Sequence, residues 1–261
     1  MEQLRRDGVD LFYDEAAGGG PPILLVHEWC CDHTYFAPQF EGYATRGHRV
    51  VAVDLRGYGQ SDKPDGSYAM GVFADDLAWI CDQIGLEKPV VIGHSMGGIV
   101  GFDLAARYTT LPSAVVMLDA AIVLPSASRE AIPGLLEKLS GPDYKEVLRQ
   151  YASGALFIPT DDPDRKERIL SGMASAPRHV MVSAMQGLHD YDPDTVGSPE
   201  VPGVYVAADE AQPRSDMSRF HEMFPDILCG KTVDSGHFCQ LEVPEQINTM
   251  IDRFLIIALP Q

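Results

Sequence analysis

The chain has 261 residues, of which 45% are hydrophobic, a size and composition suited to one folded domain with a substantial core. Its formal net charge of −18 argues against nucleic acids and anionic membrane surfaces as partners. There is no long uncharged apolar run and no apolar segment behind the first residues. We therefore expect no transmembrane span, no signal peptide and a cytoplasmic location.

Five cysteines occur along the chain without the spacing of metal ligands: Cys30, Cys31, Cys81, Cys229 and Cys239. Their odd number and the expected location predict reduced thiols. The sequence also lacks a phosphate-binding glycine loop, so we expect a small-molecule substrate that is handled without a metal or another cofactor. The sequence leaves the oligomeric state open.

Strand and helix patterns alternate along residues 1–121. A weakly alternating hairpin is predicted over residues 1–14. After it, short β-branched runs predict buried strands, and apolar residues at helical spacing predict the helices between them. The predicted strands are 23–26, 49–53, 89–92 and 114–118, and the predicted helices are 35–45, 68–84 and 99–106. This order predicts an α/β fold with an open, mostly parallel sheet, whose active site lies at the carboxyl ends of the strands.

Residues 122–198 break this alternation. Helical patterns follow one another there with Gly, Pro and Asp between them and no strand pattern; they cover 133–139, 144–151, 164–173 and 178–189. Strands at 204–208 and 227–232 and helices at 213–224 and 245–255 then resume the earlier order. We therefore expect an α/β core of residues 1–121 and 199–261 and an all-helical insertion of residues 122–198.

The sequence Gly93-His94-Ser95-Met96-Gly97 joins a predicted strand directly to a predicted helix. Such a turn leaves no room for side chains beside its central residue, so glycines flank the serine and the serine backbone is strained. The following helix directs its free N–H groups and the positive end of its dipole toward the hydroxyl. A hydroxyl placed in this way attacks a carbonyl once a base removes its proton.

This arrangement resembles the nucleophile elbow of the α/β-hydrolase superfamily. The resemblance extends over nearly the whole chain and includes residues 54–61, which match the pattern Asp-x-x-Gly-x-Gly-x-Ser. It implies a mostly parallel sheet flanked by helices, a Ser–His–acid triad and a cap, which here corresponds to residues 122–198. It does not fix the substrate.

The resemblance implies roles for a histidine and an acid. His237 follows a glycine in the loop after the last predicted strand, which is the superfamily position of the triad histidine. A carboxylate must orient this histidine and stabilise its cation. Asp119 directly follows the strand after the elbow and is our preferred acid, while Asp209, after the next strand, is the alternative.

An acyl-transfer site also needs two N–H donors for the oxyanion. Met96, directly after Ser95, supplies one. By position, the backbone of Trp29 supplies the other, with Glu28 as second choice. Members of the superfamily usually carry a glycine where this chain has Glu28. Its carboxylate therefore either approaches the pocket or points outward, and the sequence does not decide which.

Residues 29–33, Trp-Cys-x-Asp-His, resemble a segment of the cofactor-independent 2,4-dioxygenases that open 3-hydroxy-4-oxoquinolines with O₂ and release carbon monoxide. In that family a His–Asp pair deprotonates the substrate, the serine is not a covalent nucleophile, and the acid follows the strand after the elbow, as Asp119 does here.

Residues expected to contact the substrate are His33, Phe157, Met181 and Met185, although each also suits ordinary packing.

The sequence thus favours a serine hydrolase acting on a small, apolar or aromatic ester, lactone or C–C substrate through Ser95, His237 and Asp119. The cofactor-independent dioxygenase, with His237 as base, is the alternative. A non-enzymatic receptor that retains the triad is a third and less favoured interpretation.

Overall fold

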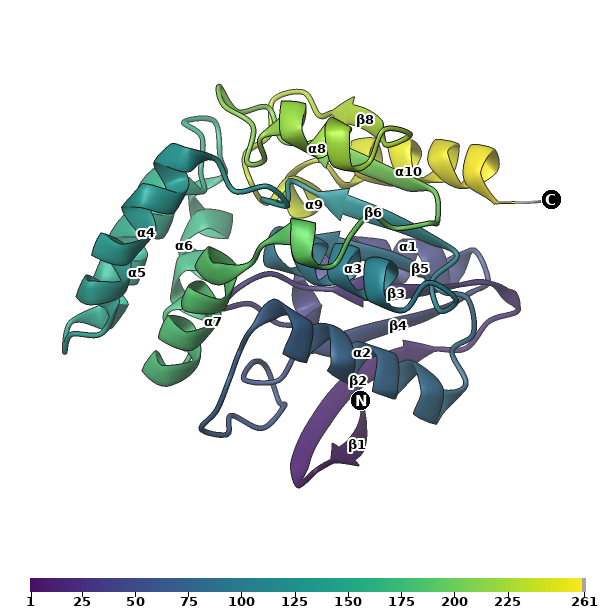
Figure 1. Ribbon diagram of the computed structural model, residues 1–261, viewed down its shortest axis with the longest axis horizontal. Coiled ribbons are helices and arrows are strands. Elements are labelled where there is room, and N and C mark those ends of the chain that lie inside the picture. The colour runs from purple at the N-terminus through teal and green to yellow at the C-terminus, as the bar shows by residue number, and fades with distance from the viewer. Residues whose placement is uncertain (260–261) are drawn as a thin grey trace.

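The fold is built around an eight-stranded sheet, which the computed structural model, describing residues 1–259, shows with helices on both faces (Figure 1). Its strands are β1 (Glu2–Arg6), β2 (Val9–Ala16), β3 (Gly20–Val26), β4 (His48–Asp54), β5 (Val90–His94), β6 (Ala114–Leu118), β7 (Gly203–Ala207) and β8 (Leu228–Lys231). They lie in the order β1-β2-β4-β3-β5-β6-β7-β8. β2 pairs antiparallel with both β1 and β4, and the five remaining pairings are parallel, so the predicted fold class is confirmed.

Ten α-helices and two short 3₁₀ segments complete the described part of the chain. The helices are α1 (Ala37–Thr45), α2 (Met70–Ile84), α3 (Met96–Arg107), α4 (Ser126–Leu139), α5 (Tyr144–Ala155), α6 (Pro163–Met173), α7 (Arg178–Asp190), α8 (Met217–Met223), α9 (Cys239–Glu242) and α10 (Pro244–Ala258). The 3₁₀ segments are His33–Phe36 and Pro193–Thr195. Helices α4–α7 come between β6 and β7 and stand together beside one end of the sheet (Figure 1).

Each central strand contributes alternate side chains to two separate parts of the core. In β3, Leu24 and Val26 pack on the face covered by α2 and α3, while Ile23 and Leu25 pack on the face covered by α1 and α10. All four side chains are buried. Burial on both faces explains why these strands are almost continuously apolar in sequence.

Two helices begin at positions that differ from the prediction by four residues or more. α8 begins at Met217 rather than at residue 213, because the Asp216 carboxylate caps the helix by accepting from the N–H groups of Ser218 and Arg219. α4 begins at Ser126, so Pro133 lies inside the helix rather than at its start. Pro133 lacks a backbone N–H, so the helix loses one hydrogen-bond donor there. The buried residues of α4, Ile132, Leu136 and Leu139, keep helical spacing on either side of it.

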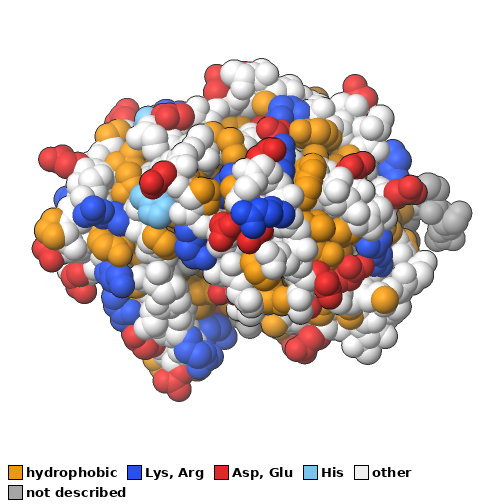
Figure 2. Space-filling model, turned by 90° about the horizontal axis from the view of Figure 1, so that it is seen from below, with side chains coloured by type: hydrophobic (Ala, Val, Ile, Leu, Met, Phe, Trp, Pro, Cys, Tyr) orange, Lys and Arg blue, Asp and Glu red, His pale blue; other side chains and the backbone are white. Residues whose placement is uncertain are grey.

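The surface carries many more acidic than basic residues, but the signs are mixed. On the face seen in Figure 2, acidic and basic side chains alternate with apolar ones. Across residues 1–259 every helix is too short or too polar to traverse a bilayer. All five cysteines carry free thiols, and all but Cys229 are buried.

Candidate active site

Ser95 occupies the turn between β5 and α3 in a conformation that few residues adopt. Its φ is 51° and its ψ is −117°, a strain of about 1–3 kcal/mol that must be offset by its surroundings. The Ser95 N–H extends the sheet ladder by donating to the Leu118 carbonyl at 2.9 Å. A Cβ on Gly93 would collide with the Gly97 carbonyl, and one on Gly97 would collide with the Val26 carbonyl. The turn therefore accepts only glycine on both sides of Ser95.

Replacing Gly97 by alanine is expected to destabilise the fold by about 1–3 kcal/mol or more, because its methyl group meets rigid backbone rather than a flexible side chain. The measurement is the free energy of unfolding in urea. Gly134 in α4 is the matched control, since a Cβ there meets nothing within 4 Å. Gly134→Ala should raise stability by about 0.5–1 kcal/mol, and equal losses in both variants would contradict the steric argument.

His237 and Asp119 meet beside Ser95 although they are far apart in sequence. The His237 Nδ1–H donates to Asp119 Oδ2 at 2.6 Å, and both side chains are buried. Asp119 follows β6 with a φ of 45°, and its other oxygen accepts from the Ala208 N–H at 3.0 Å. Burial alone would raise the pKa of Asp119, but its contacts with His237 and Arg214 lower it overall. Asp119 is therefore held as an anion that orients the ring.

Asp209 is engaged elsewhere. Its carboxylate accepts from the Lys231 ammonium at 2.8 Å and from the Asp234 N–H at 3.1 Å, and its side chain is 41% exposed. The bond to Lys231 is the main reason that the pKa of Asp209 is lowered. Within residues 1–259 it makes no hydrogen bond with His237, so the two aspartates considered from sequence occupy different environments.

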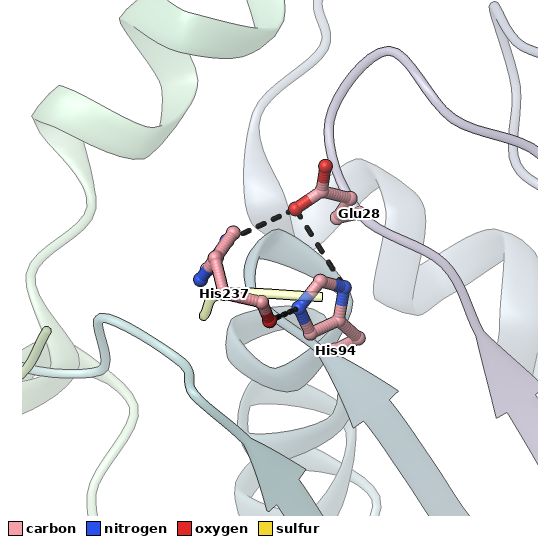
Figure 3. A group of neighbouring side chains, drawn as sticks. All are labelled: Glu28, His94 and His237. Carbon is pink, nitrogen blue, oxygen red and sulfur yellow. Dashed lines mark hydrogen bonds and ion pairs between the residues drawn. The ribbon is translucent and has the colours of Figure 1, made fainter. Parts of the chain in front are cut away.

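Glu28 points into the site and binds the second nitrogen of the His237 ring. Its Oε2 lies 3.0 Å from His237 Nε2 (Figure 3). Its Oε1 accepts from the Cys31 thiol at 3.2 Å. Glu28 is 2% exposed. Of the two possibilities left open by the sequence, the carboxylate therefore approaches the pocket.

The two carboxylates control the charge of His237. Burial and the positive charge of Arg214 act to lower the pKa of His237, but hydrogen bonds to Asp119 and Glu28 outweigh them and raise it to about 9. Burial would likewise raise the pKa of Glu28, yet its bond with His237 lowers it. The described arrangement is thus a buried imidazolium between two carboxylates.

The loop after β3 is fixed by its own histidine and by the helices beside it. His27 Nε2 accepts from the Leu55 N–H at 3.0 Å, so its Nδ1–H donates to the Glu28 carbonyl at 2.7 Å. The Trp29 indole Nε1–H donates to the Met181 carbonyl of α7 at 2.9 Å. Among residues 1–259, the backbone N–H groups of Trp29 and Met96 have no acceptor, which leaves both free for a ligand.

His94, which precedes Ser95, completes a group that resembles a set of metal ligands. Its Nδ1 is 3.6 Å from Glu28 Oε2, and Glu28 also contacts His237 (Figure 3). However, the His94 Nε2–H donates to the His237 carbonyl at 2.7 Å, and its Nδ1 accepts from the Gln240 amide at 3.1 Å. Both ring nitrogens of His94 are thus engaged in hydrogen bonds, and we treat Glu28, His94 and His237 as a hydrogen-bond network rather than as metal ligands. Burial is the main reason that the pKa of His94 is lowered to about 4, so this ring is neutral.

A cavity of about 1020 Å³ lies between the sheet and helices α4–α7. Ser95, His237 and Glu28 line its floor, and Phe157 and Met185 are among the apolar side chains of its walls. The wall also includes Leu124, Ile132, Leu135, Tyr151, Leu156, Met173 and Leu188.

Two residues expected to contact the substrate lie outside this cavity. Met181 is fully buried behind Trp29, and its carbonyl serves as the acceptor for the indole. His33 lines a separate, smaller hollow, where its Nδ1 and its backbone N–H both contact Asp54, at 2.8 and 2.9 Å. Its bond to Asp54 is the main cause of its raised pKa. Both residues therefore hold loops in place.

Arg214 is a site residue that the sequence analysis missed. It lies 3.3 Å from Asp119 and 2.5 Å from Glu210, donates to the Ala155 carbonyl of α5 at 2.6 Å, and lines the cavity. It comes from the segment predicted as helix 213–224, and nothing in that segment distinguishes it as a site residue. The substitution of glutamate for the usual glycine was, by contrast, a visible signal for Glu28.

Comparison with known proteins agrees with this architecture. A family model described as alpha/beta hydrolase fold matches residues 21–244. The AB hydrolase superfamily protein YisY of Bacillus subtilis (strain 168) is 27% identical over 256 residues, which cover 94% of this chain and 95% of the relative.

Solved structures share the same fold over their full length. A thermophilic esterase from Thermogutta terrifontis superposes with a TM-score of 0.85 and 24% identity, covering 99% of both chains. An enol-lactonase from Burkholderia xenovorans LB400 has a TM-score of 0.84 and 20% identity, covering 98% of this chain and 100% of the other. At these identities the likeness establishes the fold alone.

Proposed function

The chain belongs to the α/β-hydrolase fold family, and from that premise we propose that it is a serine hydrolase using Ser95, His237 and Asp119 as its triad. The observation that carries this proposal is the 2.6 Å bond between His237 and Asp119 on the floor of a cavity that Ser95 also lines. In the family's enzymes, as here, the strained serine sits at the amino end of a helix, whose dipole favours developing negative charge.

The proposed reaction proceeds through an acyl-enzyme. Neutral His237 accepts the Ser95 proton at Nε2 as Oγ attacks the substrate carbonyl, and Asp119 stabilises the resulting imidazolium. The free N–H groups of Trp29 and Met96 bind the oxyanion. His237 then passes the proton to the leaving group, and water releases the acyl group by the same route.

We propose further that residues 122–198 form a cap over a core of residues 1–121 and 199–261. Helices α4–α7 supply the apolar walls of the cavity, and these favour a small apolar or aromatic acyl group. Suitable substrates are therefore uncharged esters, lactones or C–C diketones. The esterase and enol-lactonase named above have the same fold, which supports this range without choosing within it.

A fluorophosphonate probe tests the proposal, because it reacts with a serine hydroxyl only where a base and an oxyanion site activate it. We expect one probe adduct per chain, located on Ser95 by peptide mass spectrometry. Heat-denatured protein is the control and should remain unlabelled. Labelling at another residue, or none across the pH range 6–10, would remove Ser95 from the proposed nucleophile role.

The cofactor-independent dioxygenase remains the second candidate, favoured by the position of Asp119 after β6 and its bond to His237. In that reaction His237 would remove a proton from the substrate hydroxyl, and Ser95 would only donate a hydrogen bond. Oxygen uptake and carbon monoxide release with a 3-hydroxy-4-oxoquinoline would support it, and the absence of oxygen uptake with that substrate would count against it.

A further inference from the structure

Glu28 occupies the place from which the proposed base would contact its serine. In a serine hydrolase, His237 Nε2 must accept the Ser95 proton. Here Nε2 is 3.0 Å from Glu28 Oε2, and among residues 1–259 the Ser95 hydroxyl makes no hydrogen bond with the ring. The ring is thus bound at both nitrogens by carboxylates, and a lone pair on Nε2 is not available in this arrangement.

The surrounding charges oppose loss of the Nε2 proton. The carboxylates facing the ring are Asp119 and Glu28, with Glu210 behind them on Arg214. Against these three negative charges, the buried cluster offers only Arg214 and the imidazolium itself. Removing the proton would leave an uncompensated buried carboxylate, which is costly in a site of low dielectric.

The other two groups in contact with Glu28 or His237 within residues 1–259, His94 and Cys31, do not supply this positive charge. His94 is the neighbouring base, but its Nε2–H is committed to the His237 carbonyl and its Nδ1 accepts from Gln240. The Cys31 thiol donates a weak hydrogen bond to Glu28 and carries no charge, because burial raises its pKa well above the usual range. In the described part of the chain, His237 is therefore the one charged partner of Glu28.

We propose that Glu28 is a positioning residue that holds a proton on Nε2 of His237, so that Ser95 gains its base only after this proton has left. The inference rests on the proposed hydrolase function. The resting imidazolium carries a proton on each nitrogen. Its Nε2 proton is first lost to water in the cavity, the Ser95 proton then moves to Nε2 as Oγ attacks, and the leaving group finally receives it. The buried carboxylate also repels anionic acyl groups from the cavity floor.

The first test is the pH dependence of fluorophosphonate labelling in the wild type, Glu28→Gln and Glu28→Gly. In the wild type the labelling rate should rise through pH of about 9, because only neutral His237 acts as base. Both variants should shift this midpoint downward and label faster at pH 7, by about ten- to eighty-fold. The upper figure compares two neutral fractions of the ring at pH 7, one for a pKa of about 6.5 and the other for a pKa of about 9.

The matched control is Glu87→Gln, the same substitution at an exposed residue before β5, at the opposite end of that strand from Ser95. It should leave the profile unchanged. An unshifted midpoint in both Glu28 variants would overturn the inference, and a shift in Glu87→Gln would show that overall charge is the cause. Glu28→Gly serves as the second variant if the Glu28→Gln protein does not fold, because glycine is the usual residue of the family at this position.

A second readout does not depend on activity. The ¹⁵N chemical shifts of the His237 ring report its protonation directly, and we expect its titration midpoint to fall in Glu28→Gln while that of His33, set by Asp54, stays constant. If this shift occurs but no variant is labelled at any pH, the hydrolase proposal fails and the charge coupling stands. If labelling occurs with an unmoved His237 midpoint, the hydrolase stands and the inference fails.

Discussion

Replacing Ser95 by alanine should lower kcat/KM for a chromogenic aryl ester by about 10⁴-fold or more, because the variant lacks the hydroxyl that we propose forms the acyl-enzyme. The assay belongs at pH 9, where about half of His237 is neutral in the wild type. Circular dichroism and the urea midpoint should be retained, since alanine fits the same turn with one atom fewer.

The same variant separates the two candidate reactions. A dioxygenase that uses only the His237–Asp119 pair would keep substantial oxygen uptake without Ser95. Ser171, which is exposed on α6 and bonds to Glu167, offers the matched serine control. Ser171→Ala should keep full ester turnover. Ester turnover that survives in Ser95→Ala would contradict an acyl-enzyme on this residue.

The second large effect is expected for Asp119→Asn, which should lower kcat by about 10⁴-fold while leaving KM nearly unchanged. The neutral amide no longer fixes which ring nitrogen carries the proton, and it no longer stabilises the imidazolium formed during attack. It also leaves the Arg214 guanidinium, 3.3 Å away, without one of its anions, so some loss of stability should accompany the kinetic effect.

Asp209→Asn is the control for this variant. Asp209 is bound to Lys231 at the surface, so its amide variant should retain most of the activity. A large loss in Asp209→Asn together with a small loss in Asp119→Asn would reverse the assignment of the acid. Steady-state kinetics at several pH values distinguishes a lost base from a shifted pKa. Activity lost through a pKa shift returns at another pH, whereas activity lost with the base does not.

The fold was largely predictable because its determinants are local. Continuous apolar strands and the glycines around Ser95 are visible in the sequence, and the structure confirms the parallel sheet they predicted. The start of α8 was missed because it depends on the Asp216 carboxylate acting as the cap, and the preceding Ser215 suits that role equally well by residue type.

The site was predictable in its members and less so in its contacts. Asp119 and Asp209 both end parallel strands, and only the direction of each carboxylate, set by the Ala208 N–H and Lys231, distinguishes them. The orientation of Glu28 depends on burial, on Cys31 and on a histidine more than 200 residues away in sequence, so no local pattern reveals it. Arg214 was missed for the same reason.

The indole of Trp29 links the loop after β3 to helix α7, and both of these segments line the cavity. Its Nε1–H is bonded to the Met181 carbonyl on α7, while its own backbone N–H is one of the two groups left free beside Ser95. If α7 moved away from the sheet, either this hydrogen bond would break or the loop after β3 would move with the helix. For the oxyanion role that we propose for the Trp29 N–H, this bond means that the position of α7 also sets the alignment of that N–H group.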